Sequence, residues 1–104
     1  MTETREKAIY SAAIETWGKE AQVVMVMEEM SELQKELCKN LRGRENIEAI
    51  AEEIADVKIM LGQMERLFSI GHLVDDYKAK KLGRLALRIT QANGGAFCTE
   101  EAEK

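Results

Sequence analysis

The sequence has no proline and few aromatic residues, with one tryptophan, two tyrosines and two phenylalanines among 104 residues. Sandwiches and barrels of short strands normally use many aromatic side chains, so the composition disfavours an all-β fold. Six methionines and many alanine, leucine, glutamate and lysine residues instead favour long helices, because these side chains lose little freedom in a helix. A chain of this length has room for one core, so we expect a single all-α domain.

An excess of basic residues is also absent, since 15 lysines and arginines stand against 19 acidic residues and the formal net charge is -4. Binding to a nucleic-acid polymer would require a basic surface. The two cysteines, Cys38 and Cys98, suggest neither a disulfide framework nor a zinc site, which fits a reducing cytoplasm. No apolar run approaches the ~20 residues that span a bilayer, and the first residues show no targeting signal. We therefore expect a cytoplasmic protein that binds neither nucleic-acid polymers nor membranes.

Apolar residues recur at steps of three and four along the chain, and glycines interrupt them. This pattern predicts helices at about residues 3–16, 19–41, 45–70 and 73–91, with Gly43 ending the second helix and Gly71 the third. We expect residues 1–92 to form one domain, a small four-helix bundle with an antiparallel helical hairpin at its core, and residues 93–104 to form a flexible tail. So short a helical domain often completes its core by self-association, so we expect a homodimer or homotetramer.

A sequence repeat links the second and third predicted helices. Residues 26–37 (VMEEMSELQKEL) align without a gap on residues 50–61 (IAEEIADVKIML), at an offset of 24 residues. Helix geometry of about 100° per residue places one apolar stripe on each copy, and the two stripes are expected to pack together. The stripes consist of Val26, Met30, Leu33 and Leu37 in the first copy and of Ile50, Ile54, Val57 and Leu61 in the second.

Four acidic residues flank these stripes at equivalent positions, namely Glu29 and Glu32 in the first copy and Glu53 and Asp56 in the second. The members of each pair are three residues apart, so they are neighbours on the surface of their helix. If the two helices are antiparallel, the two pairs lie opposite each other. Carboxylates beside an apolar seam repel one another unless a cation pairs with them. Oxygen ligands suit a hard cation such as Mg²⁺, with Mn²⁺ as a substitute, and substrate phosphates commonly complete the coordination of Mg²⁺.

Two simpler interpretations of the four acids are a solvated helix face and the duplication of a helical hairpin that carries no site. A carboxylate-bridged di-iron site fits poorly because it takes two Glu-x-x-His pairs, whereas His72 is the only histidine. The alternative function is that of a non-catalytic helical interaction module whose acidic face binds a basic partner.

The two-part motif resembles that of the MazG-like all-α nucleoside triphosphate pyrophosphohydrolase superfamily. The motif is Glu-x-x-Glu followed by Glu-x-x-Asp, in the contexts EEMSELQKEL and EEIADVKIML, and the resemblance covers roughly residues 18–68. It implies an oligomeric helical bundle in which the four acids hold magnesium. It also implies hydrolysis of an NTP or dNTP to the monophosphate and pyrophosphate, which removes unwanted nucleotides. In-line attack by water on phosphorus fits these residues, with Glu32 or Glu53 orienting or deprotonating the water.

Substrate contacts are expected from two further places. Lys81 and Arg84 share a basic face of the fourth predicted helix and are candidates for contacting the β and γ phosphates, although such faces are often only solvated. Trp17 precedes the helix that carries the first acid pair and could stack on the base, together with Gln22. A single tryptophan at a helix junction more often belongs to the core, so both interpretations of Trp17 stay open.

Overall fold

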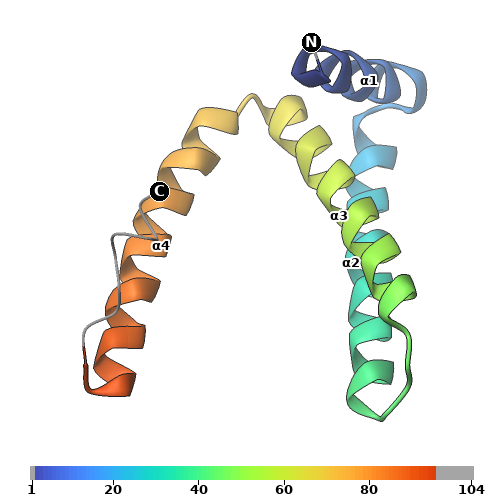
Figure 1. Cartoon of the computed structure of the whole chain (residues 1–104). Coiled ribbons are helices and arrows are strands. Elements are labelled where there is room, and N and C mark those ends of the chain that lie inside the picture. The colour runs from blue at the N-terminus through green and yellow to red at the C-terminus, as the bar shows by residue number, and fades with distance from the viewer. Residues whose placement is uncertain (1, 96–104) are drawn as a thin grey trace. The chain divides into compact units, whose positions relative to one another are not determined.

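The computed structural model describes residues 2–95, and this range contains helices and turns but no β-strand. Four helices follow one another along it (Figure 1), namely α1 (Thr2–Trp17), α2 (Lys19–Leu41), α3 (Ile47–Phe68) and α4 (Gly71–Asn93). The prediction of an all-α fold is therefore confirmed. Residues 96–104, which make up most of the predicted tail, lie outside the described residues. No helix in the described range is long and apolar enough to cross a membrane.

Residues with positive φ angles follow each of the first three helices. Gly18 (φ 91°) lies between α1 and α2, and Gly43 (φ 98°) follows the end of α2, as predicted for a glycine that ends a helix. The predicted end of the third helix is wrong. This helix stops at Phe68, because Ser69 adopts a left-handed conformation (φ 55°), and Gly71 is instead the first residue of α4.

The chain divides into two compact units. The first extends to Ile70 and contains α1, α2 and α3, whereas the second begins at Gly71 and contains α4. Within the first unit, α2 and α3 pack closely side by side and are joined by a short turn of residues 42–46 (Figure 1). The segments that carry the two copies of the repeat are thus neighbours in space.

The turn between α2 and α3 is fixed by the side chain of Asn46. Its Nδ2 donates hydrogen bonds to Glu36 O (2.9 Å) and Glu36 Oε1 (2.8 Å), and Asn40 Nδ2 donates a bond to Asn46 Oδ1 at 3.2 Å. The bond from Asn46 is also the main reason why the pKa of the Glu36 carboxyl lies below its usual value. These bonds join the last turns of α2 to the residue before α3, so they help to set the register between the two helices.

The core of the first unit is small. Val26 on α2 and Met60 on α3 are buried, with 7% and 6% of their surface exposed, and the amide side chains of Gln22 and Gln63 are also buried. The predicted apolar stripes are only partly covered, because four of their members keep 41–50% of their surface exposed, namely Met30, Leu37, Ile54 and Leu61. The unit by itself therefore leaves much of its predicted core accessible.

Helix α1 packs against α3 where Gly62 leaves room for Tyr10. A Cβ atom added at Gly62 would lie 2.7 Å from Tyr10 Cε2, which is closer than carbon atoms normally approach. In the same contact, Arg66 Nε donates a hydrogen bond to Ser11 Oγ at 2.7 Å. The missing side chain at Gly62 thus permits the close approach of the two helices.

We expect Gly62→Ala to loosen α1 from α3, and a second background separates this effect from helix propensity. In a Tyr10→Ala background, Gly62→Ala should stabilise the protein by up to about 1 kcal/mol, because alanine favours a helix more than glycine does. With Tyr10 present, the same substitution should be about 1–3 kcal/mol less favourable, because the added methyl group overpacks the ring. Urea denaturation measures both effects. Equal effects in the two backgrounds would contradict the role assigned to Gly62.

Candidate metal centre

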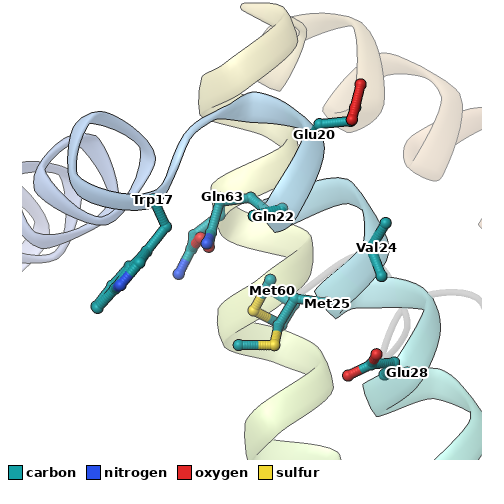
Figure 2. A pocket seen from close by; sticks show the side chains of 9 residues that line it. Trp17, Glu20, Gln22, Val24, Met25, Glu28, Met60 and Gln63 are labelled. Carbon is teal, nitrogen blue, oxygen red and sulfur yellow. The ribbon is translucent and has the colours of Figure 1, made fainter.

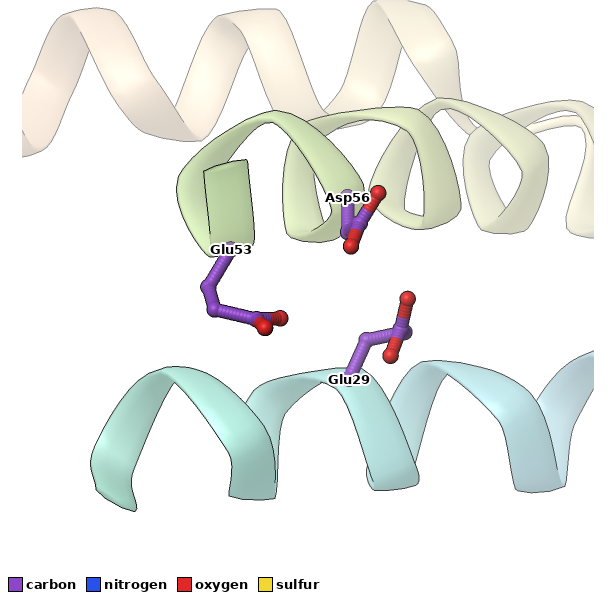
Figure 3. Close-up of side chains that lie close together, drawn as sticks. All are labelled: Glu29, Glu53 and Asp56. Carbon is purple, nitrogen blue, oxygen red and sulfur yellow. The ribbon is translucent and has the colours of Figure 1, made fainter. Parts of the chain in front are cut away.

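Three of the four predicted metal ligands come together between α2 and α3. Glu29 lies on α2, Glu53 and Asp56 lie on α3, and each offers a carboxylate oxygen within 4.8 Å of the other two. All three residues are half-buried. Figure 3 shows the three carboxylates turned toward one another from the two facing helices. The two copies of the repeat therefore supply acids to one common point.

The convergence of these carboxylates makes their charged forms costly. Burial raises the pKa of Glu29 above its usual value, and the charges of Asp56 and Glu53 raise it further. Burial also raises the pKa of Glu53, followed in importance by the charge of Asp56. Within the described residues, no basic side chain forms an ion pair with these three acids. The cluster thus concentrates negative charge without a positive partner in residues 2–95.

One oxygen of the cluster is buried without a hydrogen-bond partner among the residues that the structure describes. Glu53 Oε1 is screened from solvent and accepts no hydrogen bond in the described part of the chain. A polar atom in this position loses its hydration and gains nothing in exchange, which is unfavourable in a folded protein. A cation held by the three carboxylates would supply that partner and remove the repulsion among them. Donor sets made only of oxygen suit Mg²⁺ and Mn²⁺, so the residues fit the predicted metal.

Glu32, the fourth predicted ligand, is not a member of this group. Its side chain is exposed on α2. Its charge nevertheless contributes to the raised pKa of Glu29 and of Glu53. Glu32 therefore lies near the cluster without sharing its point of convergence, and its roles in metal binding and in activating water stay predictions.

The raised pKa values predict how the stability of the metal-free protein depends on pH. A carboxyl whose pKa is higher in the folded state binds its proton more tightly there. Its contribution to stability is therefore present at low pH and is lost as the pH rises from about the ordinary value of 4.5 through the folded pKa. The side chain of Glu29→Gln does not ionise, so the variant does not lose stability in this way. Its free energy of unfolding relative to that of the natural protein should therefore increase from about pH 4 to about pH 7.

Urea denaturation in the presence of EDTA at several pH values measures this difference. The matched control is Glu28→Gln, which changes the neighbouring, exposed carboxylate that does not belong to the cluster. Its stability relative to the natural protein should change much less over the same range. The same pH dependence for both variants would contradict the electrostatic role of the cluster.

A pocket of about 580 Å³ lies where the end of α1 meets α2 and α3. Trp17 and Gln22, the two residues predicted to contact the base, both line this pocket (Figure 2). Trp17 is 65% exposed and is therefore not a core residue of the isolated unit, whereas Gln22 is buried. Met25 and Met60 contribute apolar surface. The structure thus brings the two predicted base contacts to one place.

Gln63 also lines this pocket, and sequence reasoning missed it. The sequence does contain one signal for Gln63, since it is a polar residue on a helix whose other inward-facing positions are apolar. Buried polar groups commonly have a specific partner, so such a residue is a candidate for a functional contact. Helical periodicity alone does not say that α1 ends above this part of α3.

Lys81 and Arg84, the predicted phosphate contacts, lie three residues apart on α4 in the second unit. Both side chains are exposed. Residues at this spacing are surface neighbours on a helix, so the two cations are able to act on one anion. Their role in phosphate binding stays a prediction.

Comparisons of this chain with protein-family models, with curated proteins and with solved structures found no match. The family resemblance therefore stays a prediction that rests on the two-part acidic motif. The function is inferred from the site itself, which combines three convergent carboxylates, an unpartnered carboxylate oxygen and a pocket in the same unit.

Proposed function

We propose that this chain is a magnesium-dependent nucleoside triphosphate pyrophosphohydrolase of the MazG-like class. It would cleave an NTP or dNTP between the α and β phosphates and so remove unwanted nucleotides from the cytoplasm. The observation that carries the proposal is the convergence of Glu29, Glu53 and Asp56, where Glu53 Oε1 has no hydrogen-bond partner within the described range. The two-part acidic motif supports the same conclusion, because it resembles the motif of that superfamily.

The residues of the cluster have different roles in the proposed reaction. When bound, magnesium supplies positive charge that offsets the negative charge of the phosphate oxygens. Glu29 and Asp56 would hold the cation from opposite helices. Glu53 would also hold the cation, and its second carboxylate oxygen would accept the proton of the attacking water. Glu32, at the margin of the cluster, is the other candidate for this proton transfer.

Substrate binding extends beyond the acids in this proposal. Trp17 and Gln22 contact the base, since both line one pocket of the first unit. Lys81 and Arg84 contact the β and γ phosphates from α4. An acidic interaction module explains the site less well, because the three carboxylates face one another at half-buried positions instead of presenting an open surface to a basic protein.

We further propose that the functional form is a homodimer or homotetramer built on an antiparallel α2–α3 hairpin. The half-exposed stripe residues support this, since apolar surface of this kind is normally covered in a small helical protein. A second copy would extend the core that Val26 and Met60 begin within one chain.

A product assay tests the proposed activity. The purified protein is incubated with each canonical NTP and dNTP and with several damaged ones, in Mg²⁺, in Mn²⁺ and in EDTA, and pyrophosphate and orthophosphate are measured separately. We expect pyrophosphate and a nucleoside monophosphate in Mg²⁺, a weaker or equal reaction in Mn²⁺, and none in EDTA. Release of orthophosphate alone, or no product with any substrate, would overturn the assignment.

A further inference from the structure

Asn46 occupies the position directly before α3, where an asparagine side chain commonly accepts a hydrogen bond from the first turn of the helix. It makes no such bond here. Its Nδ2 instead donates to two oxygens of Glu36 on α2, the backbone O at 2.9 Å and the carboxylate Oε1 at 2.8 Å. Asn40 Nδ2 donates to Asn46 Oδ1 at 3.2 Å, which fixes the orientation of the amide. We call these three hydrogen bonds the turn clamp, because they hold the start of α3 against α2.

The turn clamp is aligned with the acidic cluster on both helices. Glu29 lies seven residues before Glu36 on α2, and Glu53 lies seven residues after Asn46. Seven residues make almost two helical turns, so each of these two pairs lies on one side of its helix with ~10 Å of rise between its members. Measured from the turn clamp, Glu29 and Glu53 therefore lie about equally far along the two helices, which agrees with the convergence of their carboxylates.

Few other contacts fix the register of α2 against α3 beside the cluster. Val26 and Met60, the buried apolar residues of the described range, lie on the side of the cluster away from the turn. Between this core and the turn, the three half-buried carboxylates repel one another in the metal-free protein. The turn clamp therefore opposes the separation of the two helices on the side where the apolar core does not.

A bound cation is sensitive to this register. Mg²⁺ requires oxygen ligands at about 2.0–2.1 Å in nearly octahedral geometry. A slip of α3 along α2 by one residue would move Glu53 and Asp56 by ~1.5 Å relative to Glu29. This displacement exceeds the tolerance of about 0.2 Å for the distance between a metal and its ligand. If the helices sample several registers, only the fraction of molecules in the correct register binds the cation, and the apparent affinity falls by that fraction.

We propose that Asn46 is a positioning residue of the metal centre, whose hydrogen bonds to Glu36 hold α3 in the register that lets its two acids share a cation with Glu29. This inference rests on the proposed function, because it takes the acidic cluster as the magnesium site. Asn46 contacts neither the metal nor the substrate in this proposal. Its loss should therefore raise the Mg²⁺ concentration needed for half-maximal rate much more than it lowers the maximal rate.

Mn²⁺ binding to the protein without nucleotide tests this proposal, with free Mn²⁺ measured by electron paramagnetic resonance. The test variant is Asn46→Ser, because serine is about as favourable as asparagine before a helix but is too short to make both bonds to Glu36. We expect Asn46→Ser to bind Mn²⁺ about tenfold more weakly than the natural protein, as for the loss of hydrogen bonds of ordinary strength. Asn40→Ser, which removes the bond that orients the amide, should weaken binding less, by about threefold. It becomes the decisive variant if thermal melts followed by circular dichroism show that Asn46→Ser is not folded.

Two control variants separate the register from stability and from charge. Ser11→Ala removes the bond that Arg66 donates in the contact of α1 with α3, so it costs stability but should bind Mn²⁺ as the natural protein does. Glu36→Gln keeps oxygen acceptors for both bonds from Asn46 and removes a charge. Its affinity should fall less than that of Asn46→Ser, because a charge about 10 Å from the cation is largely screened by salt. In the product assay, Asn46→Ser should need about tenfold more Mg²⁺ for its half-maximal rate.

Three results would overturn the inference. These are an unchanged Mn²⁺ affinity in Asn46→Ser, an equal loss of affinity in Ser11→Ala, which would show a general effect of stability, and a larger loss in Glu36→Gln than in Asn46→Ser, which would show that Glu36 acts through its charge. Absence of Mn²⁺ binding by the natural protein would refute the metal centre and the inference together.

Failure of the proposed function is otherwise recognised separately. Mn²⁺ binding that depends on Asn46, without hydrolysis of any triphosphate, refutes only the enzymatic activity. Pyrophosphate release by the natural protein, together with an unchanged Mn²⁺ affinity in Asn46→Ser, refutes only the role of Asn46.

Discussion

Replacing Glu53 with glutamine is expected to lower magnesium-dependent turnover by about 10²–10⁴-fold, the usual contribution of a general base. The substitution keeps the shape of the side chain and removes its charge. Glu53 supplies one of the three converging carboxylates, and its Oε1 accepts no hydrogen bond from any described residue. The variant thus loses a metal contact and the group that accepts the proton of the attacking water. Helix content should be unchanged, because the backbone hydrogen bonds that hold α3 together do not involve this side chain.

The matched control for this prediction is Glu52→Gln. Glu52 is the preceding residue on α3, its side chain is exposed, and it is not a member of the cluster. We expect its rate at saturating Mg²⁺ and substrate to stay close to that of the natural protein. A second measurement, the shift of the melting temperature by Mg²⁺, should be smaller in Glu53→Gln than in Glu52→Gln. Full activity of Glu53→Gln would refute the assignment of the metal centre.

A comparison with Glu32→Gln identifies the carboxylate that accepts the proton. Glu32 is exposed and lies outside the point where the other three acids converge. If Glu53 is the base, Glu32→Gln should retain far more activity than Glu53→Gln, with its main effect on the Mg²⁺ concentration needed for half-maximal rate. A larger loss of maximal rate in Glu32→Gln than in Glu53→Gln would transfer the role to Glu32. Steady-state rates over a range of Mg²⁺ concentrations distinguish the two results.

Much of the acidic cluster could be predicted from the sequence because helical periodicity fixes the angular position of each acid on its own helix. The repeat placed Glu29, Glu53 and Asp56 beside equivalent apolar stripes, and the structure brings the three together. Periodicity does not fix the rotation of one helix against another, which depends on side-chain packing. This is why the sequence did not distinguish Glu32, which lies at the margin, from the three acids that converge.

Sequence reasoning missed Gln63 because its place in the pocket depends on contacts between segments that are distant in the sequence. It misplaced the end of α3 because more than one residue type adopts the left-handed backbone conformation that ends a helix. The place of Gln63 in the pocket requires α1 to end above α3, and the close contact of Tyr10 with Gly62 shows how those helices meet. Ser69 ends α3 in a left-handed conformation, which glycine adopts more often than serine does. Gly71 was therefore the more obvious candidate for the end of that helix.

The half-exposed apolar stripes lead to a second prediction with a large expected effect. Leu61 is a member of the predicted seam but keeps 44% of its surface exposed in the described structure. In the proposed oligomer a second copy covers this surface. Leu61→Glu would place a charge in that interface, and in a symmetric dimer both copies would carry the substitution. We expect the dissociation constant of the oligomer to rise by about a hundredfold, as for the loss of about 1.4 kcal/mol in each copy.

Sedimentation velocity over a range of protein concentrations measures this change. The matched control is Ile59→Glu, because Ile59 has a similar exposure of 46% and lies two residues before Leu61, on nearly the opposite side of α3. We expect Ile59→Glu to leave the assembly intact. Dissociation of Leu61→Glu alone would then show that the position of the added charge, and not its presence on α3, causes the effect. If the natural protein is a monomer at all concentrations, or if Leu61→Glu assembles as tightly as Ile59→Glu, a second copy does not cover this stripe.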